Sequence, residues 1–347
     1  MKQELRIGNR VLKQGGPLFI VAECGVTCNY DVAMTKQLID VVAESGADGI
    51  KLIFWFPDEI MSDRSVTYSY ETVHGEKSEN MYEMLMKLRF SLSEWKEIKA
   101  YADEKNVILF STVNSPTGVL WAEELQLAAY KLSSWDFNDL PLWRRIARLG
   151  KPMIIDTGPV NLLDVARVIA LMEEEGNEQA LLVHCYHTSD PKQVNMRTIP
   201  YMRHAFEAPV GFSSKDLTDE MDIAAVALGA VFLEKRLTVR RDLPGHHHAI
   251  SKEPDEFKRY VETMRMVHAS LGEETLRPST VDLEERGKWF RHLAANRALP
   301  KGKILAEGDI TGKRGEQGVS PEFFEWFLGR KLRRELKENE ALTWMDV

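Results

Sequence analysis

This 347-residue chain has few cysteines and contains no long apolar run. The three cysteines, Cys24, Cys28 and Cys185, are too few and too odd in number to build a disulfide framework, which favours a reducing compartment. No stretch approaches the ~20 consecutive apolar residues of a membrane span. The start, MKQELRIGNR, has no apolar signal core. We therefore expect a cytoplasmic protein with no membrane partner.

Basic residues are in the minority. The chain has 45 Lys and Arg against 53 Asp and Glu, a formal net charge of −8. Residues 291–347 hold 11 basic and 9 acidic residues, so they carry +2 and the first 290 residues carry −10. An acidic main body argues against nucleic acid as a partner. The hydrophobic content of 44% excludes a disordered or fibrous chain.

Eight short runs rich in Val, Ile and Leu recur along most of the chain, each the length of a strand and mostly apolar on both faces. Helical patterns separate them. Eight strand–helix units in about 250 residues are typical of a (β/α)8 or TIM barrel. A doubly wound sheet with an extra strand stays open, because periodicity alone does not separate the two folds. The runs lie at residues 19–25, 49–54, 107–112, 128–134, 152–158, 180–186, 208–214 and 230–238.

Two stretches depart from this repeat. Residues 55–91 are long for a loop that follows a strand, and such loops in compact domains are often functional lids. The repeat also stops after residue 272. We expect a barrel over residues 1–272, a polar linker with some helix over 273–290, and a small β-rich domain with several turn signals over 291–347.

Polar side chains gather where the predicted strands end, which is where barrels of this kind form their active sites. Because an unpaired buried charge is costly, five cations at these ends indicate a cationic cup for a small ligand with a phosphate and a carboxylate. Glu23 and Glu234 would balance part of the charge. The five cations are Lys51, Lys131, Lys215, Lys235 and Arg236.

Motifs along nearly the whole chain resemble the sialic acid synthase family. They include PLFIVAECG, LSEWKEIKAYADEKNVILFST, YKLSS and GHHHAISKEPDEF, and the tail RHLAANRALPKGKILAEGDITGKRGEQGVSP is similar to the family's antifreeze-like (SAF) domain. The resemblance implies a TIM barrel followed by a β-rich SAF domain. It also implies an enzyme that condenses phosphoenolpyruvate with a sugar aldehyde, giving a nonulosonic or related 2-keto-3-deoxy sugar acid and phosphate.

The resemblance assigns roles to single residues. Glu23 matches the acid of the first strand, and Asp136 stands where the family has Glu; both are candidates for proton transfer, and Glu234 joins them as a catalytic residue. Arg314 matches an Arg that is expected to enter the partner subunit's barrel, which implies a domain-swapped homodimer. The residues implied to bind substrate are Lys51, Thr112, Lys131, Ser134, Thr157, His184, Ser213 and His248.

The chain departs from the family at its two divalent-metal ligands. The histidine after strand seven is Lys215 here, and the one after strand eight is Arg236. Lys and Arg do not serve as ordinary metal ligands at neutral pH. The family's Mn or Mg site is therefore expected to be lost, and no cofactor is predicted. We expect Lys215 and Arg236 to act catalytically by holding the aldehyde oxygen, or an anionic group of an altered acceptor.

Other interpretations stay open. The tract His246–His248 is a weaker candidate for a rebuilt metal site, because adjacent side chains rarely converge on one ion. Tyr30, Ile53 and Asp156 replace family residues on the acceptor side, which suggests an acceptor other than N-acetylmannosamine. The alternatives to a synthase are an inactive homologue that binds ligand, and a different phosphoenolpyruvate or pyruvate reaction on the same barrel.

Overall fold

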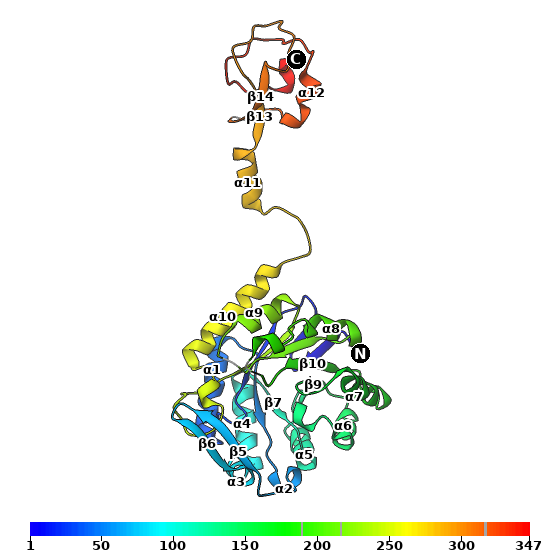
Figure 1. Ribbon diagram of the computed structural model, residues 1–347, viewed down its shortest axis with the longest axis vertical. Helices are drawn as coiled ribbons and strands as arrows, with labels where there is room; N and C mark the ends of the chain where they lie inside the picture. Colours follow the sequence, from blue (N-terminus) through cyan, green and yellow to red (C-terminus); the bar gives the residue numbers. More distant parts are fainter. Residues whose placement is uncertain (189, 216, 316–317) are drawn as a thin grey trace. The chain divides into compact units, whose positions relative to one another are not determined.

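A computed structural model describes residues 1–188, 190–215, 217–315 and 318–347 (Figure 1). The chain divides into two compact units, Met1–Gly272 and Glu273–Val347. Within the described residues, no helix is long and apolar enough to cross a membrane.

The first unit is a closed barrel of eight parallel strands, so the TIM-barrel prediction is confirmed and the doubly wound alternative is wrong. Each of the eight apolar runs forms one strand, and the strands lie around the barrel in chain order. The strands are β3 (Phe19–Glu23), β4 (Gly49–Ile53), β7 (Ile108–Thr112), β8 (Tyr130–Leu132), β9 (Met153–Asp156), β10 (Ala180–Cys185), β11 (Val210–Ser213) and β12 (Phe232–Arg236).

Helices follow the strands, and local sequence signals set their ends. Asp31 caps the first helix by accepting a hydrogen bond from the Met34 amide, and Gly46 ends it with φ 73°, a left-handed conformation that suits glycine. Ser91 and Glu94 form a reciprocal capping box on another. The barrel helices are α1 (Val32–Ser45), α4 (Leu92–Glu104), α5 (Pro116–Glu124), α6 (Leu140–Ala147), α7 (Leu162–Glu174), α8 (Thr198–Phe206), α9 (Glu220–Ala227) and α10 (Pro254–Leu271).

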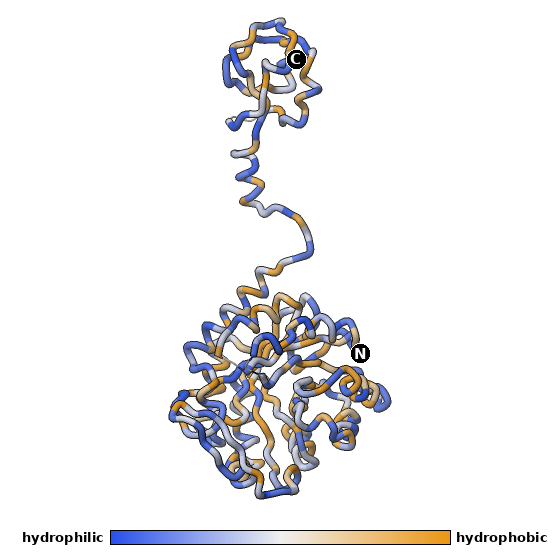
Figure 2. Tube along the Cα trace, in the orientation of Figure 1, coloured by the Kyte–Doolittle hydropathy of each residue, from blue (hydrophilic) through white to orange (hydrophobic). Residues whose placement is uncertain are grey.

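Apolar side chains fill the amino-terminal half of the barrel interior. Phe19 and Phe232 stack there with ring centroids 5.8 Å apart. The hairpin of β1 (Glu4–Ile7) and β2 (Arg10–Lys13) adds Leu5 to the same cluster. In Figure 2 the hydrophilic segments of this unit gather toward its periphery. Because apolar side chains fill this amino-terminal half, a ligand site inside the barrel is confined to the carboxyl ends of the strands.

The long loop after β4 has structure of its own. It contains α2 (Pro57–Ile60), a hairpin of β5 (Thr67–Thr72) and β6 (Gly75–Asn80), and α3 (Met81–Lys87). The rings of Tyr68 and Tyr70 each lie 5.5 Å from the ring of His246, which follows β12. The hairpin therefore packs against the loop that follows the last barrel strand.

The second unit has its own small core. It contains α11 (Thr280–Trp289), an antiparallel pair of β13 (Arg291–Ala295) and β14 (Ile310–Arg314), and α12 (Phe324–Phe327). Phe327 and Leu342 are fully buried in its apolar cluster. Among the described residues of this unit, β13 and β14 are the only named strands, and irregular segments connect the other elements.

Candidate active site

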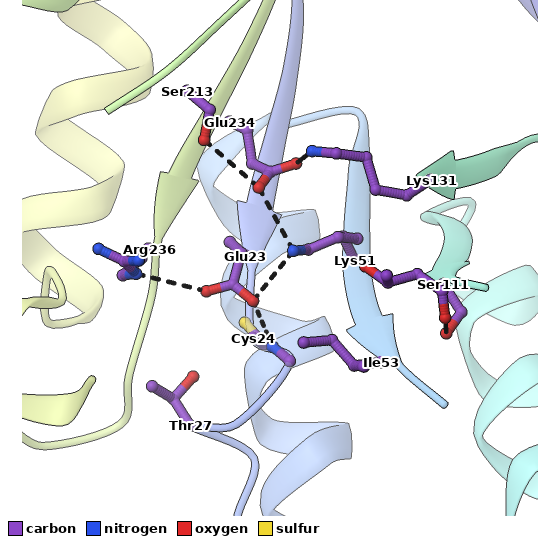
Figure 3. Close-up of polar contacts among 12 residues, drawn as sticks. Glu23, Cys24, Thr27, Lys51, Ile53, Ser111, Lys131, Ser213, Glu234 and Arg236 are labelled. Carbon is purple, nitrogen blue, oxygen red and sulfur yellow. Dashed lines mark hydrogen bonds and ion pairs between the residues drawn. The ribbon is translucent and has the colours of Figure 1, made fainter. Parts of the chain in front are cut away.

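The carboxyl end of the barrel holds a buried chain of ion pairs in which cations and carboxylates alternate (Figure 3). Its members come from β3, β4, β8, β9 and β12, because each strand turns alternate side chains into the barrel. In order along the network they are Arg236, Glu23, Lys51, Glu234, Lys131 and Asp156.

Two lysines form the centre of this ion-pair chain. Lys51 Nζ lies 3.2 Å from Glu23 Oε1 and 3.4 Å from Glu234 Oε1. Lys131 Nζ lies 2.5 Å from Glu234 Oε2 and 2.9 Å from Asp156 Oδ1. The Lys131 side chain is 0% exposed and that of Lys51 is 8% exposed. Buried charges of this kind are tolerated because each has an opposite partner.

Arg236 and Ser213 extend the ion-pair chain on the β11–β12 side. Arg236 Nε lies 3.7 Å from Glu23 Oε2, a buried oxygen that accepts no hydrogen bond within the described residues. Ser213 Oγ donates to Glu234 Oε1 at 3.4 Å, and the Gly25 amide donates to Glu23 Oε1 at 2.8 Å. Both glutamates are therefore held in fixed orientations.

The acids of the ion-pair chain differ in how readily they take up a proton. Burial alone would raise the pKa of Glu234, but Lys131 and Lys51 outweigh it and lower that pKa to about 2. Burial raises the pKa of Asp156, and the negative charge of Glu234 adds to the effect against the opposing charge of Lys131. Asp156 therefore takes up a proton more readily than Glu234 does.

A second polar group lies beside the ion-pair chain. Lys215, which follows β11, contacts His187 Nδ1 through its Nζ, and His187 Nε2 lies 3.5 Å from Ser134 Oγ. Arg236 Nη1 donates to the Lys215 backbone carbonyl at 3.2 Å. Burial, reinforced by the charge of Arg236, lowers the pKa of Lys215 to about 8. The Trp135 ring lies 4.5 Å from that of His187.

Two cavities open on this side of the barrel. One of about 220 Å³ is lined by Lys215, His187, Tyr186 and Thr188. The other, of about 360 Å³, lies over the loops after β9 and β10 and is lined by Thr157, His187 and apolar side chains of α7 and α8. His187 lines both cavities.

The structure brings most of the predicted site residues together. Glu23, Lys51, Lys131, Ser213, Glu234 and Arg236 share one network, and Ser134 and Lys215 meet through His187. Thr112 is buried at the end of β7. Thr157 Oγ1 donates to the Val183 carbonyl at 3.2 Å.

Two predicted histidines, His184 and His248, lie away from the ion-pair chain. His184 points outward from β10, since it alternates with the inward Val183, and its Nε2 donates to the Val194 carbonyl at 2.7 Å. His248 has Nδ1 2.7 Å from Thr238 Oγ1 and Nε2 3.0 Å from Asn29 Oδ1. These bonds hold both imidazoles in place, and His184 also lines the cavity of about 360 Å³, so their substrate contact stays a prediction.

Asp136 and Arg314 are also outside the ion-pair chain. Asp136 lies in a short 3-10 helix after β8, and burial together with Asp139 raises its pKa to about 6. Arg314 belongs to the second unit, where its Nε donates to the Trp289 carbonyl at 3.1 Å.

Lys235 contradicts the predicted cationic cup. It points out of the barrel, where its Nζ lies 2.8 Å from Asp222 Oδ2 on α9. Its neighbours Glu234 and Arg236 point into the barrel. Because successive side chains of a strand point to opposite faces, Lys235 must point outward. The cup is also balanced more fully than predicted, because Asp156 adds a third carboxylate.

Two histidines were missed as site residues. His187 lies in an irregular loop, where no sequence pattern fixes the direction of a side chain. His247 has φ 73°, a strained conformation for a residue with a side chain, and its buried Nδ1 has no hydrogen-bond partner within the described residues. Burial and the charge of Arg236 lower the pKa of His247 far below its ordinary value. A neutral imidazole is therefore close to the cations of the site.

The donor set at this end of the barrel does not fit a divalent metal. Lys215 and Arg236 offer only N–H groups, and Arg236 faces Glu23. Across the part of the chain that the structure describes, no three His, Cys, Asp or Glu side chains are grouped so that they could hold a metal ion. The tract His246–His248 does not converge, since His248 is bonded to Thr238 and Asn29.

The fold and site define a TIM-type barrel protein with a buried ion-pair cluster at the carboxyl ends of its strands, followed by a small second domain. The chain belongs to the NeuB family: that family's model matches residues 38–275, and the SAF domain model matches residues 290–347. The family resemblance predicted from the motifs is thereby confirmed.

Relatives of the chain are synthases of sugar acids and proteins of polysaccharide synthesis. It is 29% identical over 327 residues to N,N'-diacetyllegionaminic acid synthase of Campylobacter jejuni, covering 93% of this chain and 98% of the relative. It is 30% identical over 365 residues to spore coat polysaccharide biosynthesis protein SpsE of Bacillus subtilis, covering 99% and 96%. The crystal structure of the latter matches with a TM-score of 0.66 at 28% identity over 99% of each chain.

Proposed function

We propose that this chain condenses phosphoenolpyruvate with a sugar aldehyde and releases phosphate and a 2-keto-3-deoxy sugar acid. The observation that carries the proposal is the pair of buried lysines, Lys51 and Lys131, held by carboxylates at the mouth of the barrel. Two fixed cations suit a small ligand with a carboxylate and a phosphate. Membership of the NeuB family and the names of the relatives support the same reaction class.

The proposed reaction balances with one water. C3 of phosphoenolpyruvate attacks the aldehyde carbon, and the aldehyde oxygen takes a proton to become a hydroxyl. Water then adds at C2 and loses one proton. The bond between C2 and the phosphate oxygen breaks, the departing phosphate takes the remaining hydroxyl proton, and the C2 ketone forms. Lys51, Lys131 and Ser213 would hold the carboxylate and phosphate, while Glu23 would orient the acceptor or the water. Asp136 is a weaker candidate, because it lies outside the ion-pair chain.

Metal independence is part of this proposal. Positive charge near the aldehyde oxygen lowers the energy of the alkoxide that develops as the carbon–carbon bond forms. Lys215 and Arg236 supply that charge, and the site offers no donor set for a divalent ion in their place.

The acceptor is proposed to differ from a standard N-acetylmannosamine. Tyr30 Oη donates to the carbonyls of Gly25 at 2.9 Å and Ile53 at 2.7 Å, so its hydroxyl is occupied by the backbone. The Ile53 side chain has no group that forms hydrogen bonds, and Asp156 is paired with Lys131. These three positions leave fewer polar groups for a hydroxyl-rich acceptor.

A homodimer completed by Arg314 is also proposed. Several apolar side chains of the segment that includes α11 are exposed, among them Val281, Trp289 and Phe290. Exposed apolar side chains on one helix favour burial against another chain.

Phosphate release in the presence of phosphoenolpyruvate and a panel of sugar aldehydes tests the function, with product masses read by mass spectrometry. Lys51→Met should abolish turnover, because the lysine is buried in the site. The matched control is Lys36→Met, which removes a partly buried lysine that pairs with the exposed Glu97 outside the site. No phosphate release with any aldehyde would contradict the proposed function.

A second candidate is a protein that binds ligand without turnover. Asp156 favours it, because its carboxylate already neutralises Lys131 and competes with a bound anion. Tight binding of phosphoenolpyruvate with no turnover across the whole panel would support this candidate.

A further inference from the structure

His187 contacts both Lys215 and Ser134, and all three residues lie outside the barrel strands. They lie in the segments that follow β11, β10 and β8, so three separate loops converge at one point. His187 uses Nδ1 for Lys215 and Nε2 for Ser134, which fixes its ring from both sides. The Trp135 ring packs 4.5 Å from the same imidazole and restricts it further.

The surroundings of Lys215 differ from those of Lys51 and Lys131. Those two lysines are paired with carboxylates, whereas Lys215 contacts an imidazole and lies beside the guanidinium of Arg236. The carboxylates that face it, Asp156 and Glu23, act on it at a distance, as does the thiol of Cys185. The positive charge of Lys215 also contributes to the lowered pKa of His247.

These surroundings make Lys215 a stronger acid than an ordinary lysine. Burial and Arg236 bring the pKa of its ammonium down to about 8. A group with a pKa near the working pH is the most effective proton donor, because a large fraction of it is protonated and it is still acidic enough to transfer the proton. Arg236 has no such ability, because its guanidinium does not lose a proton in this range.

Lys215 also has access to a ligand. It lines the cavity of about 220 Å³ together with His187, Tyr186 and Thr188. Its side chain is thus half-buried beside this cavity. An acceptor bound in this cavity would present its carbonyl oxygen to Nζ.

We propose that Lys215 is the proton donor of the condensation, with His187 as the residue that positions its amine. This inference rests on the proposed function. As C3 attacks the aldehyde carbon, the electron pair of the C=O bond moves to oxygen, and that oxygen takes a proton from Nζ. Lys215 is then a neutral amine. When water adds at C2, it gives up a proton that returns the amine to its ammonium form, so the group is unchanged after each turnover.

The first test compares Lys215→Arg with the wild type across pH, using phosphate release as the readout. Arg keeps the charge and does not donate a proton. We expect kcat to fall at least about 100-fold and the wild-type loss of rate above about pH 8 to vanish, while KM for phosphoenolpyruvate changes little. A Lys215→Arg variant with the wild-type rate and the same pH profile would overturn the proposal in favour of a fixed cation.

His187→Ala tests the positioning role. It should lower kcat by about tenfold and move the alkaline limb of the pH profile, because the amine loses its partner. His187→Gln keeps an acceptor for Nζ and should restore most of the rate. Equal rates in both variants and the wild type would contradict the role of His187.

Competitive chemical labelling of the Lys215 amine, followed by mass spectrometry as a function of pH, needs no substrate. We expect a midpoint near 8 in the wild type and a higher midpoint in Arg236→Gln. A midpoint at the ordinary 10.5 would overturn the inference even in an active enzyme. Failure of the proposed function shows itself differently, as a wild type that turns over no aldehyde.

Discussion

Asp156 is the residue that most changes the picture of a cationic cup. Its carboxylate shares Lys131 with Glu234, so the three cations of the ion-pair chain face three carboxylates. An entering phosphate must therefore compete with a resident negative charge. The raised pKa of Asp156 offers a way to relieve that competition, because a protonated, neutral carboxyl group no longer repels an anion.

The variant Asp156→Asn should bind phosphoenolpyruvate more tightly. Removing one charge about 3 Å from Lys131 is worth several kcal/mol at protein-like screening, so we expect at least about a tenfold lower Kd by calorimetry at pH 8. Wild-type affinity should rise as the pH falls toward the raised pKa of Asp156, and the variant should lose that part of the pH dependence. The control is Asp103→Asn, which removes an exposed acid that pairs with Lys99 on α4. Unchanged or weaker binding in Asp156→Asn would contradict the account.

Glu234 stabilises the fold as well as the site. Glu234→Gln removes one partner of both Lys51 and Lys131 and should cost about 3 kcal/mol in the free energy of unfolding, measured in urea. Because its pKa is lowered to about 2 in the fold, the stability it provides is present above its ordinary 4.5 and is lost as the pH falls from there toward 2. The exposed Glu97, paired with Lys36, is the control, and Glu97→Gln should cost about 1 kcal/mol or less. A similar loss in both variants would argue against a special role for the buried pair.

At the scale of elements, the side chains of β12 alternate between the barrel interior and the surrounding helices. Glu234 and Arg236 serve the site inside the barrel, while Lys235 joins the strand to the helices outside. Its Nζ lies 2.8 Å from Asp222 Oδ2, and Asp222 also accepts hydrogen bonds from Tyr260 on α10 at 2.9 Å and from Ser214. One buried acid thus links β12, α9 and α10.

Lys235→Met should destabilise the barrel without weakening the site. Leaving Asp222 without its buried cation is expected to cost about 3 kcal/mol in the free energy of unfolding. The double variant Lys235→Met with Asp222→Leu should recover much of this loss, because no buried charge remains unpaired. Phosphoenolpyruvate affinity should stay unchanged, as measured by calorimetry. A large loss of affinity would mean that Lys235 reaches the ligand after all.

Much of the architecture was accessible from sequence because it rests on local patterns. The eight apolar runs predicted β3, β4 and β7–β12. The inclusion of Lys235 in the predicted cationic cup was wrong, because the alternation of β12 turns its side chain outward to Asp222. What sequence did not provide is the direction of side chains in loops: His187 meets Lys215 and Ser134 only through long-range folding, and no periodicity places them together.

At the scale of the whole molecule, the proposed homodimer can be tested at the exposed apolar side chains of α11 and the residue that follows it. Trp289 and Phe290 are 60% and 55% exposed, a poor environment for large apolar rings. We expect sedimentation to show a dimer, and the double variant Trp289→Ser with Phe290→Ser to shift it to a monomer. Leu163→Ser is the control, since Leu163 is an exposed apolar residue of α7 in the barrel. A wild-type monomer, or a double variant that remains a dimer, would contradict the prediction.

The central claim is that Lys215 and Arg236 replace a metal in a phosphoenolpyruvate-dependent condensation. Its most direct test is phosphate release by the wild-type protein before and after exhaustive chelation, with the most active sugar aldehyde of the panel. The account predicts the same rate in both samples and no gain when Mn²⁺ is added. Loss of activity on chelation that Mn²⁺ restores would contradict it.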